Sequence, residues 1–387
     1  MWMLALGAFV NRLGSFATPF LAIYLTRARM LPIERAGFIV SLVGFGAMGS
    51  GPVGGFLADR LGRRNALAIA TLCGGSSMLA LAFVRDVSLI AVVALLVGFC
   101  GDMYRPVVAS ITADVLPPED RARGYGLLYW AVNLGVSISL LCAGAIADVS
   151  FTYLFVGDAL TTFAFGALVC ASVPDVPRSL PKSAKAHQTS IFAPYRDVRF
   201  LGVCLASLGI ALMMLQGYVT LPLDMRAHGV TNVEYGAIFA INGIMVVVLQ
   251  PFSSSIVSKH TPGRVLAACA VLTGFGFSIC AISPGNISIY VLSLVIWTLG
   301  EIGGAPMMPA LVSEMAPEQV RGSYQGAYQL SWGAASFLAP IVGTFMMHHF
   351  GARALWESCA ALGLVCAGGY LTLVPSRNAG APPARAT

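Results

Sequence analysis

The sequence predicts an all-α membrane protein with twelve transmembrane helices arranged as two pseudo-symmetric bundles of six. Three observations lead to this fold class. Apolar runs close to 20 residues long recur along the chain, one long polar stretch interrupts them near the middle, and polar landmarks of the first half return in the second half. A run of about 20 apolar residues is the length that an α-helix needs to cross a bilayer.

The composition excludes a soluble domain. Of 387 residues, 57% are hydrophobic and 10% are charged, whereas a soluble domain carries about 25% charged residues. Strands of a membrane barrel would read as alternating segments of about ten residues, which the long runs do not resemble. The net charge of +6 is typical of basic loops beside a membrane and does not indicate nucleic-acid binding.

The apolar runs predict twelve spans, which in chain order are 3–26, 36–58, 65–84, 87–113, 123–147, 150–173, 200–223, 233–257, 264–283, 286–313, 322–347 and 351–374. Between the sixth and seventh spans lies a segment rich in proline and basic residues. The predicted domains are therefore an N-terminal bundle (1–173), a linker (174–199), a C-terminal bundle (200–374) and a disordered tail (375–387).

Basic residues predict the orientation of the spans. Fifteen Lys and Arg residues fall on the side that carries the termini and the linker, and six fall on the other side. Basic loops remain in the cytoplasm. Both termini and the linker are therefore predicted to be cytoplasmic, in a multi-pass protein of the cell inner (plasma) membrane.

The two halves repeat at an offset of 200 residues. The matched pairs are Pro106 with Pro306, Asp114 with Glu314, Pro117 with Pro317, Arg121 with Arg321, and Gly126 with Gly326. Two similar sets of six helices in this order predict two bundles related by an axis along the membrane normal. Such bundles enclose a central cavity and can rock against each other.

A charged hinge separates the second and third spans. The stretch from Gly55 to Arg64 reads G-F-L-A-D-R-L-G-R-R, and this density of charge requires a tight loop outside the hydrocarbon. Gly62 is expected to adopt a positive φ, because glycine does so without steric cost.

This hinge, together with the span count and the duplication, resembles the major facilitator superfamily over the whole chain. Tyr129-Trp130 with Asn133-Leu134, and Leu299-Gly300-Glu301, are similar to the LmrP-like multidrug exporters of its drug/proton antiporter branch. The chain departs from the branch pattern at Ala94, at Leu128 and at Ser139-Leu140.

The resemblance implies a conformational latch at the hinge. Asp59 is expected to face the N-terminal end of span eleven near Gly322 and Ser323, where a helix dipole favours an anion. Arg63 is expected to pair with Asp114. The predicted latch residues are Gly55, Asp59, Arg60, Gly62, Arg63, Arg64 and Asp114.

Charges within the spans mark candidate sites, because an ionisable group in hydrocarbon is costly unless it faces a cavity or a partner. Arg12, Asp102 and Glu301 lie near the middle of spans one, four and ten. Asp102 and Arg105 are three residues apart and can pair, as a structural ion pair or as part of a substrate or proton site. Glu301 has no arginine within one helical turn and is the predicted proton carrier, with structural hydrogen bonding as the alternative. The predicted proton-coupling residues are Glu301, Asp102 and Asp158, the last of which could equally cap a helix or line the outer vestibule.

A central cavity requires adaptable apolar and polar walls. The candidates, for each of which core packing is the alternative, are Asn11, Arg12, Phe16, Tyr24, Tyr104, Arg105, Tyr129, Trp130, Asn133, Met213, Gln216, Asn242, Met307 and Gln329. Asp224, at the outer end of span seven, is expected to be solvated. The nine cysteines and five histidines show no metal-ligand spacing, so no metal site is predicted.

These features predict a proton-coupled exporter of small amphipathic or drug-like molecules that works by alternating access. The alternative is an importer or facilitator of a specific solute. If that solute is an anion, Arg12 and Arg105 are expected to hold its carboxylate or phosphate. A membrane scaffold or enzyme without flux is a remote alternative. The chain holds no Walker loop, nucleophile elbow or HExxH motif, so no catalysis is expected. The expected partners are a small-molecule substrate, protons and lipid, with no nucleic acid, no cofactor beyond the proton gradient, and a monomeric state.

Overall fold

A computed structural model of the chain describes residues 1–15, 21, 24–172, 192–230, 232–257, 259–282 and 285–374, and in these ranges the regular structure is helical. Phe16, the tail 375–387 and most of the predicted linker lie outside the described residues. The elements are α1 (Trp2–Leu13), η1 (Tyr24–Ala28), α3 (Ile33–Leu61), α4 (Arg63–Phe83), α5 (Val87–Gly101), α6 (Tyr104–Val115), α7 (Pro118–Val149), α8 (Phe151–Ser172), η2 (Ala193–Arg196), α9 (Val198–Val219), α10 (Leu221–Ala227), α11 (Asn232–Val257), α12 (Pro262–Ser278), η3 (Ile279–Ala281), α13 (Ile287–Met315), η4 (Glu318–Val320) and α14 (Arg321–Leu373).

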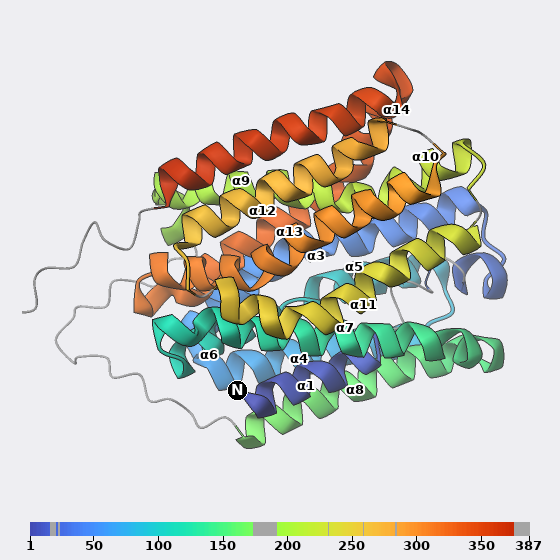
Figure 1. Cartoon of the computed structure of the whole chain (residues 1–387). Helices are drawn as coiled ribbons and strands as arrows, with labels where there is room; N and C mark the ends of the chain where they lie inside the picture. Colours follow the sequence, from blue (N-terminus) through green and yellow to red (C-terminus); the bar gives the residue numbers. More distant parts are fainter. Residues whose placement is uncertain are drawn as a thin grey trace, which may run out of the picture. The chain divides into compact units, whose positions relative to one another are not determined.

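Nine helical segments in the described part of the chain are long and apolar enough to cross a membrane. The longest of them includes α14, which contains two helices that meet at Gly351, where φ is 84°. Figure 1 shows the chain turning back on itself at this point. The 32-residue helix α7 and the first helix α1 supply the remaining two of the twelve predicted spans.

The predicted fourth span is not one helix. Helix α5 ends at Gly101, a turn follows at Asp102 and Met103, and α6 begins at Tyr104. Pro106 explains the break, because it has no N–H to give to the carbonyl four residues earlier and its ring clashes there. The predicted span over 87–113 is present as an apolar segment from Val87 to Val115, and a turn at Asp102 and Met103 interrupts it.

The helices group into two compact units. Unit 1 contains Met1–Arg196 with Val312–Phe337, and unit 2 contains Asp197–Leu311 with Leu338–Thr387. The boundaries predicted from the sequence, at 173 and 200, stay a prediction.

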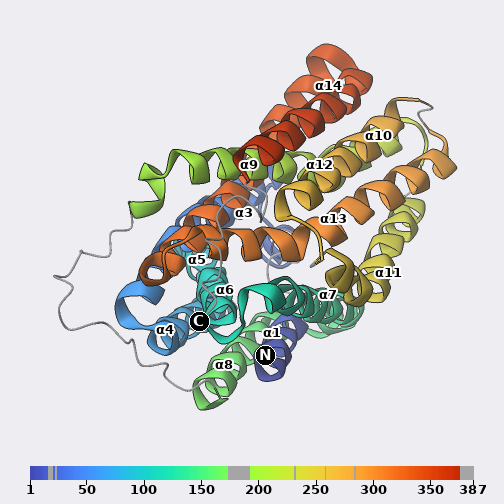
Figure 2. The same cartoon turned by 60° about the vertical axis from the view of Figure 1, so that its left-hand side comes forward.

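In unit 1, α1 packs along α7 and α8, while α4 packs along α5 and α8. Figures 1 and 2 both show α1 beside α8. A hydrophobic cluster includes Leu25, Ile90 and Phe155. Tyr24, a cavity candidate, is 6% exposed in this cluster, and its ring meets that of Phe155 edge to face at 5.1 Å. The structure therefore places Tyr24 in a packed core.

In unit 2, stacked aromatic rings form the core between α12, α13 and α14. The ring of Phe277 lies parallel to Trp297 at 5.4 Å and to Trp356 at 6.2 Å, and all three side chains are almost completely buried. Met213 on α9, another cavity candidate, is also buried, with 1% exposure.

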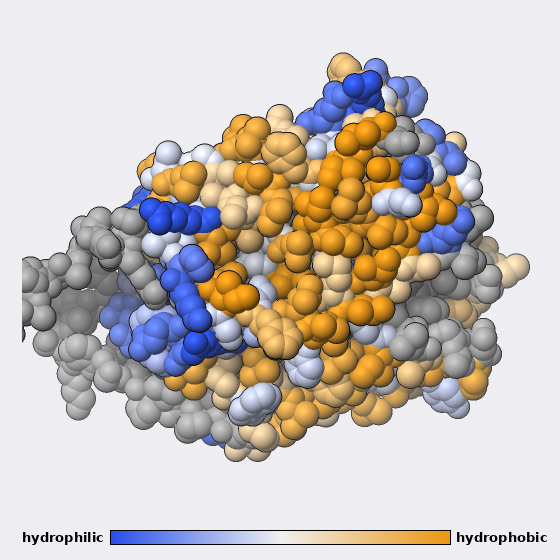
Figure 3. All heavy atoms as spheres, in the orientation of Figure 1, coloured by the Kyte–Doolittle hydropathy of each residue, from blue (hydrophilic) through white to orange (hydrophobic). Residues whose placement is uncertain are grey.

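The surface of the helices is apolar. Phe38, Leu205 and Phe252 are each more than 60% exposed. Figure 3 shows hydrophobic side chains covering the central part of the visible face, with hydrophilic ones gathered toward the helix ends. Exposed apolar side chains on helices of this length face lipid, and the chain is a multi-pass membrane protein.

Candidate functional site

The hinge between α3 and α4 is a single residue. Gly62 ends α3 and precedes Arg63, the first residue of α4, with φ 87° and ψ 159°. A side chain would be strained in this conformation, so the expectation of a positive φ at Gly62 is confirmed. Arg60 lies with its guanidinium 5.7 Å from the ring centre of Phe56, and Arg64 is exposed.

Asp59, in the last turn of α3, is fully buried and accepts four hydrogen bonds. Its Oδ1 accepts from the backbone N–H of Gly322 at 2.8 Å and from Arg63 Nη1 at 2.7 Å. Its Oδ2 accepts from the N–H of Ser323 at 2.6 Å and from the Ser323 hydroxyl at 2.7 Å. Gly322 and Ser323 are in the first turn of α14, whose N–H groups have no partner within the helix. The carboxylate therefore caps α14, as the sequence predicted.

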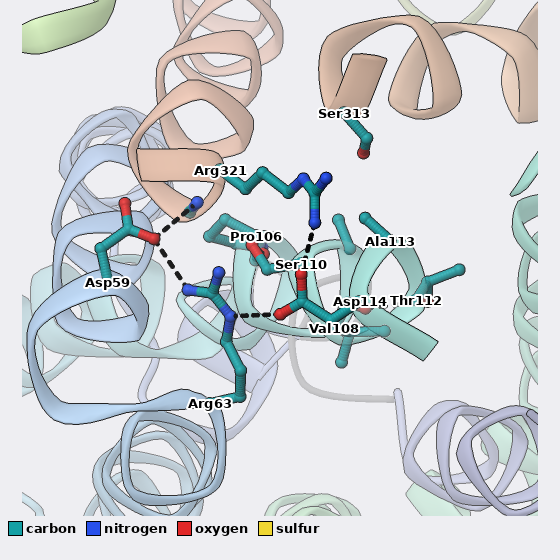
Figure 4. Close-up of polar contacts among 12 residues, drawn as sticks. Asp59, Arg63, Pro106, Val108, Ser110, Thr112, Ala113, Asp114, Ser313 and Arg321 are labelled. Atoms are coloured by element: carbon teal, nitrogen blue, oxygen red, sulfur yellow. Dashed lines mark hydrogen bonds and ion pairs between the residues drawn. The ribbon is translucent and has the colours of Figure 1, made fainter. Parts of the chain in front are cut away.

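A second carboxylate extends the cluster. Asp114, near the end of α6, accepts from Arg63 Nε at 3.0 Å and from Arg321 Nη1 at 2.8 Å. Figure 4 shows Arg63 lying between the two acids, with Arg321 on the far side of Asp114. The Arg63–Asp114 pair was predicted from the sequence. Arg321 was missed, although its match to Arg121 in the repeat had singled it out.

Glycines allow α3 and α14 to come into backbone contact beside this cluster. A Cβ added at Gly55 would lie 1.9 Å from the carbonyl oxygen of Gly322, and one added at Gly326 would lie 2.3 Å from that of Gly51. Both distances are far below van der Waals contact. The two Gly-x-x-x-Gly pairs thus form a seam in which each helix backbone touches the other.

Arg121 occupies the position in the repeat that corresponds to Arg321, but it has a different role. It lies in the first turn of α7, before the predicted span, and donates from Nη2 to the carbonyl oxygen of Ala113 at 3.0 Å. Burial and the nearby Arg321 cation lower the pKa of the Arg121 guanidinium. Lys259 stands where the repeat would place a second Asp59.

A charged cluster surrounds the break between α5 and α6. Asp102 Oδ1 lies 2.8 Å from Arg105 Nε and 3.5 Å from Arg12 Nη2. Arg12 also donates to the hydroxyl of Tyr104 and interacts electrostatically with Asp158. The side chains of Asp102 and Arg105 are 39% and 43% exposed. Five predicted site residues therefore lie together in unit 1: Arg12, Asp102, Tyr104, Arg105 and Asp158.

Neighbouring predicted residues are buried around this cluster. Asn11 donates from Nδ2 to the Thr162 hydroxyl at 3.0 Å, and its own carbonyl accepts from Thr161. Asp158 is 7% exposed. Thr162 was not predicted, because one threonine in an apolar helix carries no local signal of a distant partner.

In unit 2, the carboxylate of Glu301 on α13 accepts a hydrogen bond from a neutral side-chain amide. Asn242 Nδ2 on α11 donates to Glu301 Oε2 at 2.9 Å and to the Thr298 hydroxyl at 3.0 Å. Asn242 and Thr298 are both buried, at 9% and 0% exposure. The structure thus joins two residues that the sequence had placed in separate roles, and it adds Thr298.

The remaining cavity candidates divide by burial. Met307 and Gln216 are buried, and Gln216 donates to the carbonyl of Ala339 at 3.2 Å. Partial exposure is found at Tyr129, Trp130, Asn133 and Gln329. Nothing in the structure tests whether these side chains contact a substrate, so that assignment stays a prediction.

Asp224 differs from its prediction. It was expected to be solvated, but it is 1% exposed. Its Oδ2 accepts from the Tyr290 hydroxyl at 3.1 Å and from Trp356 Nε1 at 3.2 Å, and His228 Nδ1 lies 3.3 Å from Oδ1. The carboxylate ties the short helix α10 to α13 and α14, which explains its burial.

The fold and the polar clusters define a class of membrane protein, the secondary transporters. A profile of the Major Facilitator Superfamily matches residues 4–226 and 199–387. The chain belongs to this superfamily and is a transporter of the secondary type, not an enzyme.

Proteins that align with most of this chain include uncharacterized transporters, a cation/proton antiporter and a multidrug resistance protein. The uncharacterized MFS-type transporter YttB of Bacillus subtilis is 25% identical over 94% of this chain and 92% of its own length. A Na(+), Li(+), K(+)/H(+) antiporter of Planococcus maritimus is 24% identical over 86% of each chain. The multidrug resistance protein MdtH of Aeromonas salmonicida is 22% identical over 90% of this chain and 87% of its own.

Solved structures agree on the fold. The proton:xylose symporter XylE superposes with a TM-score of 0.79, at 16% identity over 97% of this chain and 95% of its own. The human organic anion transporter MFSD10 does so with a TM-score of 0.78, at 16% identity over 95% and 98%. The predicted fold of twelve helices in two bundles is that of the superfamily.

Proposed function

We propose that this transporter is a proton-coupled exporter of small amphipathic or drug-like molecules. It works as a monomer in the cell inner membrane, with both termini in the cytoplasm, by alternating access of a central site to the two faces. The proton gradient supplies the energy, and no other cofactor takes part.

The observation that carries this proposal is the pairing of Glu301 with a neutral amide. Asn242 donates to the Glu301 carboxylate, and an amide donor stays neutral whether the acid is charged or protonated. An acid paired with an arginine, as Asp102 is with Arg105, is held in its charged form. Glu301 is therefore the proposed coupling residue, and Asp102 and Asp158 in unit 1 stay candidates for the same role.

The relatives support exchange driven by protons, without naming a substrate for this chain. The Planococcus protein is named as a cation/proton antiporter and MdtH as a multidrug resistance protein.

Transport by purified protein in proteoliposomes tests the proposal. A chemically broad panel of lipophilic cations, neutral drugs and organic anions is assayed with and without a pH gradient. We expect Glu301→Gln to abolish the acceleration by the gradient while exchange without a gradient persists. Glu357→Gln is the matched control, because Glu357 is an exposed acid paired with Arg353 on the same helix. Gradient-driven transport that survives Glu301→Gln would overturn the coupling role.

A second candidate function is transport of a specific organic anion. Arg105 is 43% exposed, and Arg12 Nε is buried without a hydrogen-bond partner. A carboxylate or phosphate could accept from both guanidinium groups. One tight anionic hit in a thermal-shift screen, lost in Arg105→Gln, would favour this function, whereas several weaker lipophilic hits would favour the exporter.

A further inference from the structure

Asn242 donates both of its described side-chain hydrogen bonds to one face of α13. Its Nδ2 reaches Glu301 Oε2 at 2.9 Å and the Thr298 hydroxyl at 3.0 Å. The two acceptors are three residues apart and so lie on the same side of the helix. Because an amide nitrogen carries two hydrogens, these two bonds use its full donor capacity and fix the plane of the amide.

The register of α11 against α13 is held by a second set of contacts. Pro306 has no N–H, so the carbonyl of Ile302, four residues before it, has no partner within α13. Gln250 Nε2 donates to this carbonyl at 3.2 Å and the Ser253 hydroxyl donates at 3.3 Å. Asn242, Gln250 and Ser253 therefore bind α13 along more than two turns of α11.

The opposite side of α13 is closed by small residues. A Cβ added at Gly300 would lie 2.6 Å from the Thr273 hydroxyl and 2.7 Å from the carbonyl of Cys269, both on α12. Gly300 thus lies tight against α12, whereas the side chain of the next residue, Glu301, reaches Asn242 on α11.

We propose that Asn242 is a positioning residue that sets the pH at which Glu301 exchanges its proton during transport. This inference rests on the coupling role proposed above for Glu301. A carboxylate that accepts an N–H is stabilised relative to its protonated form, so the Asn242 bond opposes the effect of burial. The Thr298 hydroxyl accepts from the same amide nitrogen and so helps to hold the amide beside the acid.

Other titratable groups lie near Glu301, on α9, α11 and α12. Tyr218 of α9 interacts electrostatically with Glu301 and with Tyr235 of α11. The thiol of Cys269, on α12, lies against Gly303 of α13. These are neutral at the pH of transport by their ordinary chemistry, and replacing the amide of Asn242 changes the hydrogen bonding of Glu301 without adding or removing a charge.

The test measures gradient-driven transport against pH in proteoliposomes. Asn242→Leu keeps the volume of the side chain and removes the donor, and we expect the midpoint of the profile to rise by about one pH unit, the equivalent of one hydrogen bond to a charged group. Asn242→Gln, which restores an amide, should bring the midpoint most of the way back. Asn65→Leu, at an exposed position of α4, is the control and should leave the midpoint in place.

A second variant and a second readout keep the test decisive if Asn242→Leu folds poorly. Thr298→Val removes only the hydroxyl that accepts from the Asn242 amide, and it should raise the midpoint by a smaller amount. The infrared carbonyl band of the protonated acid, identified by its loss in Glu301→Gln, should titrate at a higher pH in Asn242→Leu. An unchanged midpoint and band, with Glu301→Gln inactive in coupling, would overturn this inference and leave the proposed function standing. Coupling that survives Glu301→Gln would overturn both.

Discussion

Asp59 of α3 accepts hydrogen bonds from both the backbone N–H and the hydroxyl of Ser323 in α14. One buried carboxylate thus holds the N-terminus of a helix that lies more than 260 residues further along the chain. Because the two groups come from opposite halves of the repeat, their separation would be a step in the alternating access proposed above.

The first prediction concerns this contact. Asp59→Asn retains the size of the side chain but loses the charge that binds Arg63 and the helix end. Breaking a buried pair costs about 3–5 kcal/mol, so transport should fall strongly and the ends of α3 and α14 that meet at Asp59 should move apart. Distances between spin labels on the two helices measure the movement. Ser323→Ala, which removes one of the four donors, should have the same effect at smaller amplitude, and an unaltered distance distribution in Asp59→Asn would contradict the latch.

The second prediction compares the two arginines on Asp114. Arg63 contacts both acids and Arg321 contacts one, so Arg63→Ala should lower the unfolding temperature in detergent more than Arg321→Ala does. A double-mutant cycle between Arg321 and Asp114 should give a coupling energy of about 1–3 kcal/mol. The exposed pair Arg123–Asp120 is the control, because surface pairs contribute about 0–1 kcal/mol. A coupling energy for Arg321 and Asp114 no larger than that of the control would show that this partly buried pair is structurally unimportant.

What could be predicted from the sequence follows the range of the forces involved. The Gly62 turn and the contacts of Asp59 and Arg63 were predictable, because the hinge motif is local and its partners are marked by the repeat. The pairing of Arg321 with Asp114 depends on how α14 approaches α6, which no local pattern specifies. The break at Asp102 could not be predicted from Pro106, because a proline alone does not decide whether a helix breaks. The matching residue of the second half, Pro306, leaves α13 continuous. There the freed carbonyl finds Gln250 and Ser253, and only the structure shows such partners.

The third prediction concerns the glycine seam between α3 and α14. Gly55→Ala would place a methyl carbon against the carbonyl of Gly322, so the helices must separate and the bonds of Asp59 must lengthen. We expect loss of transport with a spin-label distance shift like that of Asp59→Asn. Gly44→Ala on the same helix is the matched control, since nothing lies within 4 Å of its added Cβ. It should transport normally and gain a little helix stability, and an equal loss in both variants would show that α3 simply does not tolerate alanine.

The last prediction concerns Asp224, whose burial contradicts the simple rule that an acid at the end of a span is solvated. Its carboxylate receives the Tyr290 hydroxyl and the Trp356 indole N–H, so α10 is tied to two helices by charge-assisted bonds. Tyr290→Phe removes one donor and should destabilise the protein by about 1.5–3 kcal/mol. Asp224→Ala should destabilise it more, because it leaves the buried hydroxyl and indole N–H without an acceptor. Thermal unfolding in detergent measures both, with Glu357→Ala of the exposed Arg353 pair as the control. If Tyr290→Phe unfolds at the same temperature as the control, the hydroxyl does not hold α10 in place, and Asp224 is buried for some reason other than these bonds.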